Sequence, residues 1–302
     1  MKNAFQPPES SSVVVGVDGS QSARAAALWA AGEAVRRGRP LHIVHGADTD
    51  GRALYLSMET IERARAAGRE LLADTADAVR AQYPGLHVTK EFSRTDAVSA
   101  LHQAGGRHGT IVVGSRGLGG FGSLMLGSVG LDVVASATTP VIVVRSDAGS
   151  EETGTVLVAL GDESDLPYAR YAAREAELRK GALRLLHVSN LLRFAVRPSG
   201  ASEDVGEEAD VRAEPLGNAT EALYAEFPHL KVRADAEKSI SVAGVLIEAS
   251  RDADLLVMGG RRVPGPLGIA RRLGRATHSV LHHAQCPVLL LPRTADGRGS
   301  GS

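Results

Sequence analysis

The stretch LHIVH at residues 41–45 returns later in the chain as LRLLH at residues 183–187. Three further pairs of similar segments follow in the same order: YPGL at 83–86 with FPHL at 227–230, TIVVG at 110–114 with DLLVMG at 254–259, and TPVIVV at 139–144 with CPVLLL at 286–291. Because the order is kept while the spacing within pairs drifts slowly, the pattern indicates one duplicated domain with small insertions.

Short apolar runs alternate with longer amphipathic stretches in each copy. In the first copy the strand-like runs are 12–17, 41–46, 86–91, 110–114 and 141–144, and the helix-like stretches lie near 21–37, 54–82, 95–107 and 128–137. Continuous apolar runs are typical of parallel strands covered on both faces. The alternation predicts an α/β protein of two tandem domains, each a doubly wound sheet with right-handed crossovers.

Polar stretches mark the expected domain boundaries. We expect a first domain at 12–147, a linker at 148–154 and a second domain at 155–293, with disordered tails at 1–11 and 294–302. Small and acidic residues dominate the linker, as is typical of connecting segments.

The composition carries no strong charge bias. The 302 residues contain 34 Lys and Arg against 35 Asp and Glu, which argues against a broad basic surface for nucleic acid. The single cysteine excludes an intrachain disulfide. No apolar run reaches the roughly 18 residues of a membrane span, and the polar N-terminus lacks a signal-peptide core. We expect a cytoplasmic protein that binds neither nucleic acid nor membrane.

The densest chemical signal follows the fourth strand-like run of the first copy. Residues 114–128 read GSRGLGGFGSLMLGS, and a helix-like stretch comes next. Glycines let the backbone approach a polyphosphate and turn its amides inward. The helix opened by Gly127 and Ser128 favours an anion at its N-terminus, where Ser128 either caps the helix or contacts phosphate. Arg116 adds a positive charge. The alternative interpretation is a flexible surface turn.

Two other nucleotide motifs are excluded. Gly117, Gly119 and Gly122 fit the spacing of the dinucleotide fingerprint, but they follow the fourth strand rather than the first. No acidic residue stands about 20 positions further on, where the ribose contact belongs. The chain also lacks the G-x-x-x-x-G-K-[S/T] sequence of P-loop NTPases.

The glycine pattern resembles that of a known family. The universal stress proteins have the pattern G-2x-G-9x-G-[S/T]. This sequence resembles it with Gly114, Gly117, nine intervening residues, Gly127 and Ser128. VVVGVDGS at 13–20 and ALWA at 27–30 resemble their first strand, turn and helix.

The resemblance covers about 12–146 and 155–293, so the chain resembles a tandem, two-domain member of the actinobacterial type. It implies an adenine-nucleotide α-hydrolase-like fold with a five-stranded sheet of order 3-2-1-4-5 in each domain. It also implies bound ATP at strands 1 and 4, and a homodimer.

The resemblance further implies a set of binding residues. Asp18 would contact the ribose, since a carboxylate can accept hydrogen bonds from both hydroxyls; alone it would read as a turn residue before Gly19. The full expected set is Gly16, Val17, Asp18, Ala47, Gly114, Ser115, Arg116, Gly117, Leu118, Gly119, Gly120, Gly127, Ser128 and Val129. Gly16, Val17 and Ala47 would line the adenine pocket, and the loop would hold the phosphates. Mg²⁺ would be coordinated by the phosphates, with no protein side chain as ligand.

The second copy departs from this pattern. Arg262 stands where the second motif glycine is expected, Arg275 where the serine is, and the gap before Gly274 is longer. Asp162 lies near the position of Asp18 but aligns with it only across a gap. We expect a weak second site at Gly259, Arg262, Gly274 and Arg275, with a solvated basic loop as an equal alternative.

Histidine and cysteine positions add little to the functional prediction. His282, His283 and Cys286 have a spacing that suggests a metal, but capping or packing is the favoured interpretation. His45 and His187 end equivalent strands, where they either reach a ligand or pack.

Three functions fit the sequence. The first is an ATP-binding regulatory protein of the stress response or dormancy. The alternatives are a slow ATPase or nucleotide hydrolase, which lacks an evident general base, and a nucleotide-free interaction module. The last strands, 141–144 and 288–291, are apolar and would leave exposed sheet edges. We therefore also expect the two copies to pair through these strands.

Overall fold

The computed structural model describes residues 11–52, 55–117, 126–145, 152–191, 214–260, 262–264 and 271–292. The chain divides into two compact units. One comprises Met1–Val144, Gly259–Gly274 and Leu290–Ser302, and the other comprises Arg145–Met258 and Arg275–Leu289. In the part of the chain that is described, no helix is both long and apolar enough to cross a bilayer.

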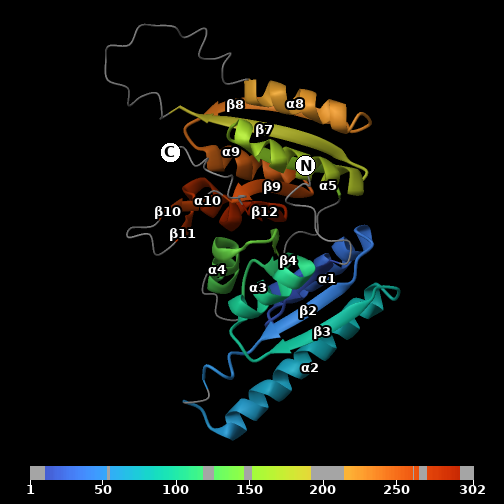
Figure 1. The fold of residues 1–302 in the computed structure, drawn as a ribbon, viewed down its shortest axis with the longest axis vertical. Helices are drawn as coiled ribbons and strands as arrows, with labels where there is room; N and C mark the ends of the chain where they lie inside the picture. The colour runs from blue at the N-terminus through green and yellow to red at the C-terminus, as the bar shows by residue number, and fades with distance from the viewer. Residues whose placement is uncertain are drawn as a thin grey trace, which may run out of the picture. The chain divides into compact units, whose positions relative to one another are not determined.

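Parallel strands form the centre of the first copy (Figure 1). They are β1 (Ser12–Gly16), β2 (Leu41–Gly46), β3 (Val88–Ser93), β4 (Gly109–Gly114) and β5 (Val141–Val144). Their spatial order is β3-β2-β1-β4-β5, and each neighbouring pair is parallel. This is the predicted order 3-2-1-4-5, so the predicted fold class is confirmed.

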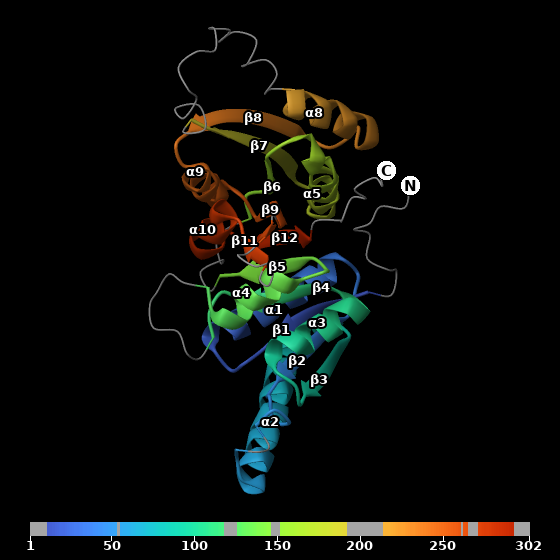
Figure 2. The same ribbon diagram turned by 60° about the vertical axis from the view of Figure 1, so that its left-hand side comes forward.

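Four helices cover the two faces of this sheet. They are α1 (Gln21–Arg36), α2 (Met58–Gln82), α3 (Ala97–His108) and α4 (Ser128–Ser136). Helix α1 contacts α2, while α3 contacts α4. Right-handed crossovers explain this division, because the chain steps outward from β1 to β3 and then returns across the sheet to β4 and β5. Figure 2 shows the long α2 extending beyond the strands that it covers.

Small and branched apolar side chains build the core of the first copy. Val13, Val14 and Val15 on β1 are each at most 1% exposed. Helix α1 faces the sheet with a stripe of buried alanines: Ala23, Ala26, Ala27, Ala30, Ala31 and Ala34. Full burial of a valine side chain contributes roughly 1.5–3 kcal/mol. The alanine stripe lets the helix backbone lie close to the strands, which positions its N-terminus beside the end of β4.

The second copy repeats the plan. Its strands are β6 (Thr155–Leu160), β7 (Ala182–Asn190), β8 (Val232–Ser239), β9 (Leu255–Gly260) and β12 (Val288–Pro292), in the spatial order β8-β7-β6-β9-β12. Its helices are α5 (Leu166–Leu178), α8 (Glu214–Glu226), α9 (Val242–Ala249) and α10 (Arg275–His283), with short 3₁₀ turns η1 (Glu163–Asp165) and η2 (Ser250–Asp252). Helix α8 lies along β8 in both views (Figures 1 and 2). The duplication therefore extends to strand order.

One element has no equivalent in the sequence prediction. Strands β10 (Arg262–Pro264) and β11 (Arg271–Leu273) pair antiparallel, with Arg262 opposite Leu273. They lie between β9 and α10, where the first copy has its glycine-rich loop. The sequence left a weak second site and a solvated basic loop open here, and the structure shows β10 and β11 paired at this position.

The first helix of each copy ends in the same way, with different residues. Gly38, which follows α1, has a φ of 59°, and Lys180, which follows α5, has a φ of 52°. In both cases the next residue donates its amide back into the helix, from Arg39 to Ala34 and from Gly181 to Ala176. This left-handed position suits glycine, whereas a lysine there is strained by its Cβ.

The strain at Lys180 gives a stability prediction. Lys180→Gly should raise the free energy of unfolding by about 0.5–1 kcal/mol, because relief of the left-handed strain exceeds the added chain entropy. The reciprocal change Gly38→Lys should lower it by about 1 kcal/mol. Urea unfolding followed by circular dichroism measures both variants. Equal stabilities of wild type and both variants would contradict the argument.

Candidate functional site

The end of β1 presents a carboxylate within a tight turn. Asp18 accepts a hydrogen bond at Oδ1 from the amide of Ser20, at 2.9 Å. Gly19 between them has a φ of 90°, which a glycine adopts without strain. Ser20 caps α1 through its side chain, which accepts from the Ala23 amide at 3.1 Å. The turn thus holds Asp18 at the carboxyl edge of the sheet, next to the start of a helix.

A histidine secures the residue before this carboxylate. His45 Nδ1 lies 2.8 Å from the carbonyl oxygen of Val17, and because a carbonyl only accepts, Nδ1 carries the proton. His187 makes the equivalent bond to the carbonyl of Leu160, at 3.0 Å. Both histidines therefore tie the end of the first strand to the second strand, which is the packing role, while contact with a ligand stays a prediction.

The phosphate-loop glycines contact this turn directly. A Cβ on Gly117 would lie 2.7 Å from Asp18 Oδ2, and a Cβ on Gly114 would lie 2.8 Å from the carbonyl oxygen of Ser22. Distances under 3.0 Å are not tolerated by real Cβ atoms. Gly114 has no room for a Cβ because the backbone of Ser22 is in the way, whereas a Cβ at Gly117 would require the Asp18 carboxylate to shift.

The two described ends of the loop lie side by side. Gly127 donates its amide to the carbonyl oxygen of Ser115, at 3.0 Å, and a Cβ on Gly127 would lie 3.6 Å from the amide nitrogen of Gly117. Leu118, Gly119 and Gly120, which the sequence assigns to the phosphate site, lie outside the described residues. The structure thus brings the first and last glycines of the motif together.

Helix α4 begins at the loop without a side-chain cap. Gly127 occupies the N-cap position and makes no side-chain capping hydrogen bond. Ser128 is the first helical residue, so it is not the cap that the sequence allowed it to be. Ser128 and Val129 are exposed at this end of the helix. The first-turn amides of a helix have no partner within the helix, and the N-cap residue Gly127 has no side chain to supply one.

Ser115 and Arg116 complete the described part of the loop. Ser115 is 3% exposed, and its Oγ has no hydrogen-bond partner among the described residues. The backbone of Arg116 is held from both sides by α1: its amide donates to Ser22 Oγ at 3.1 Å, and its carbonyl accepts from Ser20 Oγ at 3.3 Å.

Backbone hydrogen bonds hold the turn after β2 against the end of β3. The amide of Ala47 donates to the carbonyl of Ser93, at 3.1 Å, and the amide of Asp50 to that of Arg94, at 3.2 Å. Gly16 and Val17 lie on the neighbouring strand end, where the amide of Val17 donates to the carbonyl of Val44 at 3.0 Å. The residues assigned to an adenine pocket are therefore close along the strand ends.

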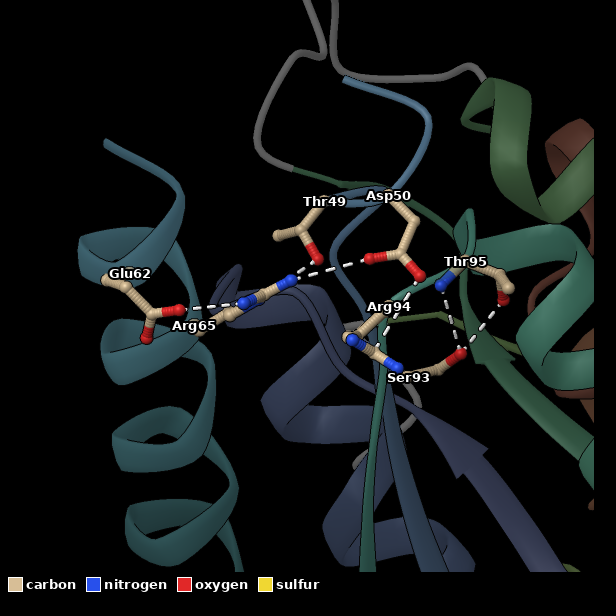
Figure 3. A network of polar contacts seen from close by, with 7 residues as sticks. All are labelled: Thr49, Asp50, Glu62, Arg65, Ser93, Arg94 and Thr95. Carbon is tan, nitrogen blue, oxygen red and sulfur yellow. Dashed lines mark hydrogen bonds and ion pairs between the residues drawn. The ribbon is translucent and has the colours of Figure 1, made fainter. Parts of the chain in front are cut away.

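Charged side chains brace this turn (Figure 3). Arg65 on α2 donates to Glu62 at 2.7 Å, and its other nitrogen lies 3.4 Å from Asp50. Arg94, which follows β3, lies 3.7 Å from the same Asp50 carboxylate. Figure 3 shows Asp50 between the two guanidinium groups, so the turn is linked to both α2 and the end of β3. The sequence analysis missed this network, because its members are far apart in the chain.

The equivalent turn in the second copy is arranged differently. Asp162 accepts from the Ser164 amide at 3.0 Å, as Asp18 does from Ser20. Asp165 also accepts from the amide of Gly161, at 2.6 Å, and completes a capping box with Asp162. The carboxylate of Asp162 thus caps a 3₁₀ turn, which has no equivalent beside Asp18.

The residues of the weak second site lie on both sides of the hairpin. Gly259 is the penultimate residue of β9, Arg262 begins β10, Gly274 follows β11, and Arg275 begins α10. A Cβ on Gly260 would lie 3.1 Å from the carbonyl oxygen of Leu291. The described residues of this segment, 262–264 and 271–273, pair with each other as β10 and β11.

The histidines near Cys286 belong to α10. The Nε2 atoms of His278 and His282 lie 3.3 Å apart, and burial, followed by the charge of His278, lowers the pKa of His282. The described residues contain no group of three or more His, Cys, Asp or Glu side chains that is arranged to hold a metal. Cys286 is buried, and burial raises the pKa of its thiol to about 12.

Comparison with known proteins gives consistent matches across the chain. The model of the universal stress protein family matches residues 10–145 and again residues 152–292. A universal stress protein of Mycobacterium tuberculosis is 29% identical over 290 residues, which cover 95% of this chain and 98% of that protein.

Solved structures give matches to the same family. The crystal structure of a universal stress protein from Archaeoglobus fulgidus has a TM-score of 0.70 at 20% identity and covers 95% of this chain and 100% of that one. A universal stress protein from Archaeoglobus fulgidus in complex with dAMP is 28% identical, covering 44% of this chain and 96% of that one, with a TM-score of 0.35.

The buried thiol gives a reactivity prediction. Cys286 should not react with a thiol reagent at pH 8 in the folded protein, because the reactive thiolate is suppressed by a pKa of about 12 and the side chain is covered. In urea the same residue should react at once. With a reagent that releases a chromophore, absorbance measures the reaction rate of Cys286 in the folded chain and in urea. Rapid labelling of the folded chain would contradict the burial of Cys286.

Proposed function

The chain belongs to the universal stress protein family, and from that premise we propose that its first copy binds an adenine nucleotide, with ATP as the ligand. The observation that carries the proposal is the uncapped N-terminus of α4 at Gly127, beside the amide of Gly117. A helix N-terminus with open amides favours negative charge, and neighbouring glycine amides extend that surface around a phosphate.

Asp18 is placed to bind the nucleoside half of the ligand. Its carboxylate lies against Gly117, so a ribose bound at Asp18 would have its phosphates directed at the loop. One oxygen, Oδ1, accepts from the Ser20 amide, and a carboxylate oxygen has lone pairs for further donors such as ribose hydroxyls. Val17 and Ala47, on adjacent strand ends, would form the sides of the base pocket.

The arrangement also agrees with the rule for doubly wound sheets. Ligands of such sheets bind beyond the carboxyl ends of the strands where the strand order reverses, here between β1 and β4. Mg²⁺ would be bound through the phosphates and water, since it retains several waters and prefers phosphate oxygens.

For the second copy we propose a weakened or lost nucleotide site. The 3₁₀ turn engages Asp162, and β10 and β11 pair at the position of the glycine motif. Backbone amides that pair across a hairpin are not available to a phosphate. We therefore expect one nucleotide per chain, bound by the first copy.

We further propose that the role is regulatory, with bound nucleotide changing the conformation or the partner contacts of a stress-response protein. Asp18 is held by the Ser20 amide and packed on Gly117, which suits ligand binding more than proton transfer.

Nucleotide content and affinity test the proposal. The purified chain is denatured, and any released nucleotide is identified by chromatography; the emptied, refolded protein is then titrated with ATP in a calorimeter. We expect an adenine nucleotide in the extract and close to one ATP per chain. A protein that is empty and gives no heat with ATP would refute the proposal.

Gly117→Ala should lower ATP affinity by about tenfold or more, because its Cβ would displace Asp18 or the loop. Gly85→Ala is the matched control, since a Cβ there meets nothing within 4 Å. Equal affinities for the two variants would count against the assigned site. Steady ATP turnover that Gly117→Ala abolishes would identify an enzyme instead of a regulator.

A further inference from the structure

The N-terminus of α1 is linked to the phosphate loop by two serine hydroxyls. Ser22 Oγ accepts from the Arg116 amide at 3.1 Å, and Ser20 Oγ donates to the Arg116 carbonyl at 3.3 Å. The two bonds therefore hold the peptide groups on both sides of one loop residue. Ser22 is 5% exposed, so its hydrogen bond to the loop is largely shielded from water.

Ser20 also connects this link to the carboxylate of Asp18, the residue proposed to bind the ribose. Its amide donates to Asp18 Oδ1 at 2.9 Å, while its hydroxyl caps α1 and contacts Arg116. Gly114 and Gly117 pack against Ser22 and Asp18 without room for a Cβ. The turn after β1 and the loop after β4 thus form one connected unit, although they are nearly a hundred residues apart in sequence.

From these contacts we infer that Ser22, together with Ser20, is a positioning residue for the phosphate loop: it sets the orientation of the Arg116 and Gly117 peptides that face the phosphates. The inference rests on the proposed nucleotide site of the first copy. Neither serine needs to contact the nucleotide. Their effect on binding passes through the backbone of Arg116.

This role should affect the phosphates more than the nucleoside. The adenine pocket is built from Val17 and Ala47, which His45 and Ser93 hold independently of Ser22. Loss of the Ser22 hydroxyl leaves the Arg116 amide without its acceptor, and the loop amides lose their fixed direction. Affinity for ATP should fall, whereas affinity for adenosine should stay nearly unchanged.

The test compares Ser22→Ala with Ser99→Ala in the full chain. Alanine is a strong helix former, so Ser22→Ala should leave α1 folded. Ser99 also lies in the first turn of a helix, where its amide donates to Asp96 at 3.0 Å, and it does not contact the loop in the described structure. ATP and adenosine are titrated against each variant by calorimetry, and amide hydrogen exchange is measured on the nucleotide-free protein.

We expect Ser22→Ala to weaken ATP binding about tenfold, with less than a twofold change for adenosine, and to speed exchange at the Arg116 amide. Ser99→Ala should match the wild type in all three readouts. Unchanged ATP affinity, or an equal loss for ATP and adenosine, would overturn the positioning role while leaving the nucleotide site intact. A wild-type chain that binds neither ligand would overturn the proposed function, and the inference with it.

Discussion

The reversal of strand order between β1 and β4 is the constraint on which the rest of the structure depends. Right-handed crossovers carry the chain to one face of the sheet after β1 and to the other face after β4. The helices after β1 and β4 therefore lie on opposite faces, and the carboxyl edge between these strands is where sheets of this kind bind ligands. The turn around Asp18 and the loop around Gly117 lie against each other at this edge.

Much of this arrangement could be predicted from the sequence. Continuous apolar runs gave most strand positions to within a residue or two, although the run at 86–91 became β3 at Val88–Ser93. The motif glycines indicated where the loop lies. The strand order itself came from the resemblance to a family, because hydrophobic pattern alone does not specify which parallel strands are neighbours.

The rest depended on contacts between distant segments. Ser22 reads as an ordinary residue in the first turn of a helix, and nothing nearby in sequence indicates its bond to Arg116. The pairing of β10 with β11 was hidden by prolines and arginines, which are typical of loops. Gly127 rather than Ser128 occupies the N-cap position of α4, a difference of one residue that local propensity does not resolve.

In each copy a histidine side chain makes a hydrogen bond to a backbone carbonyl at the end of the first strand. His45 and His187 each hold a backbone carbonyl, so this anchor does not depend on which side chains the loops carry. A duplicated domain with such a ligand-independent anchor can exchange its loop without losing its sheet. In the second copy the same anchor stands beside a different segment, the paired strands β10 and β11.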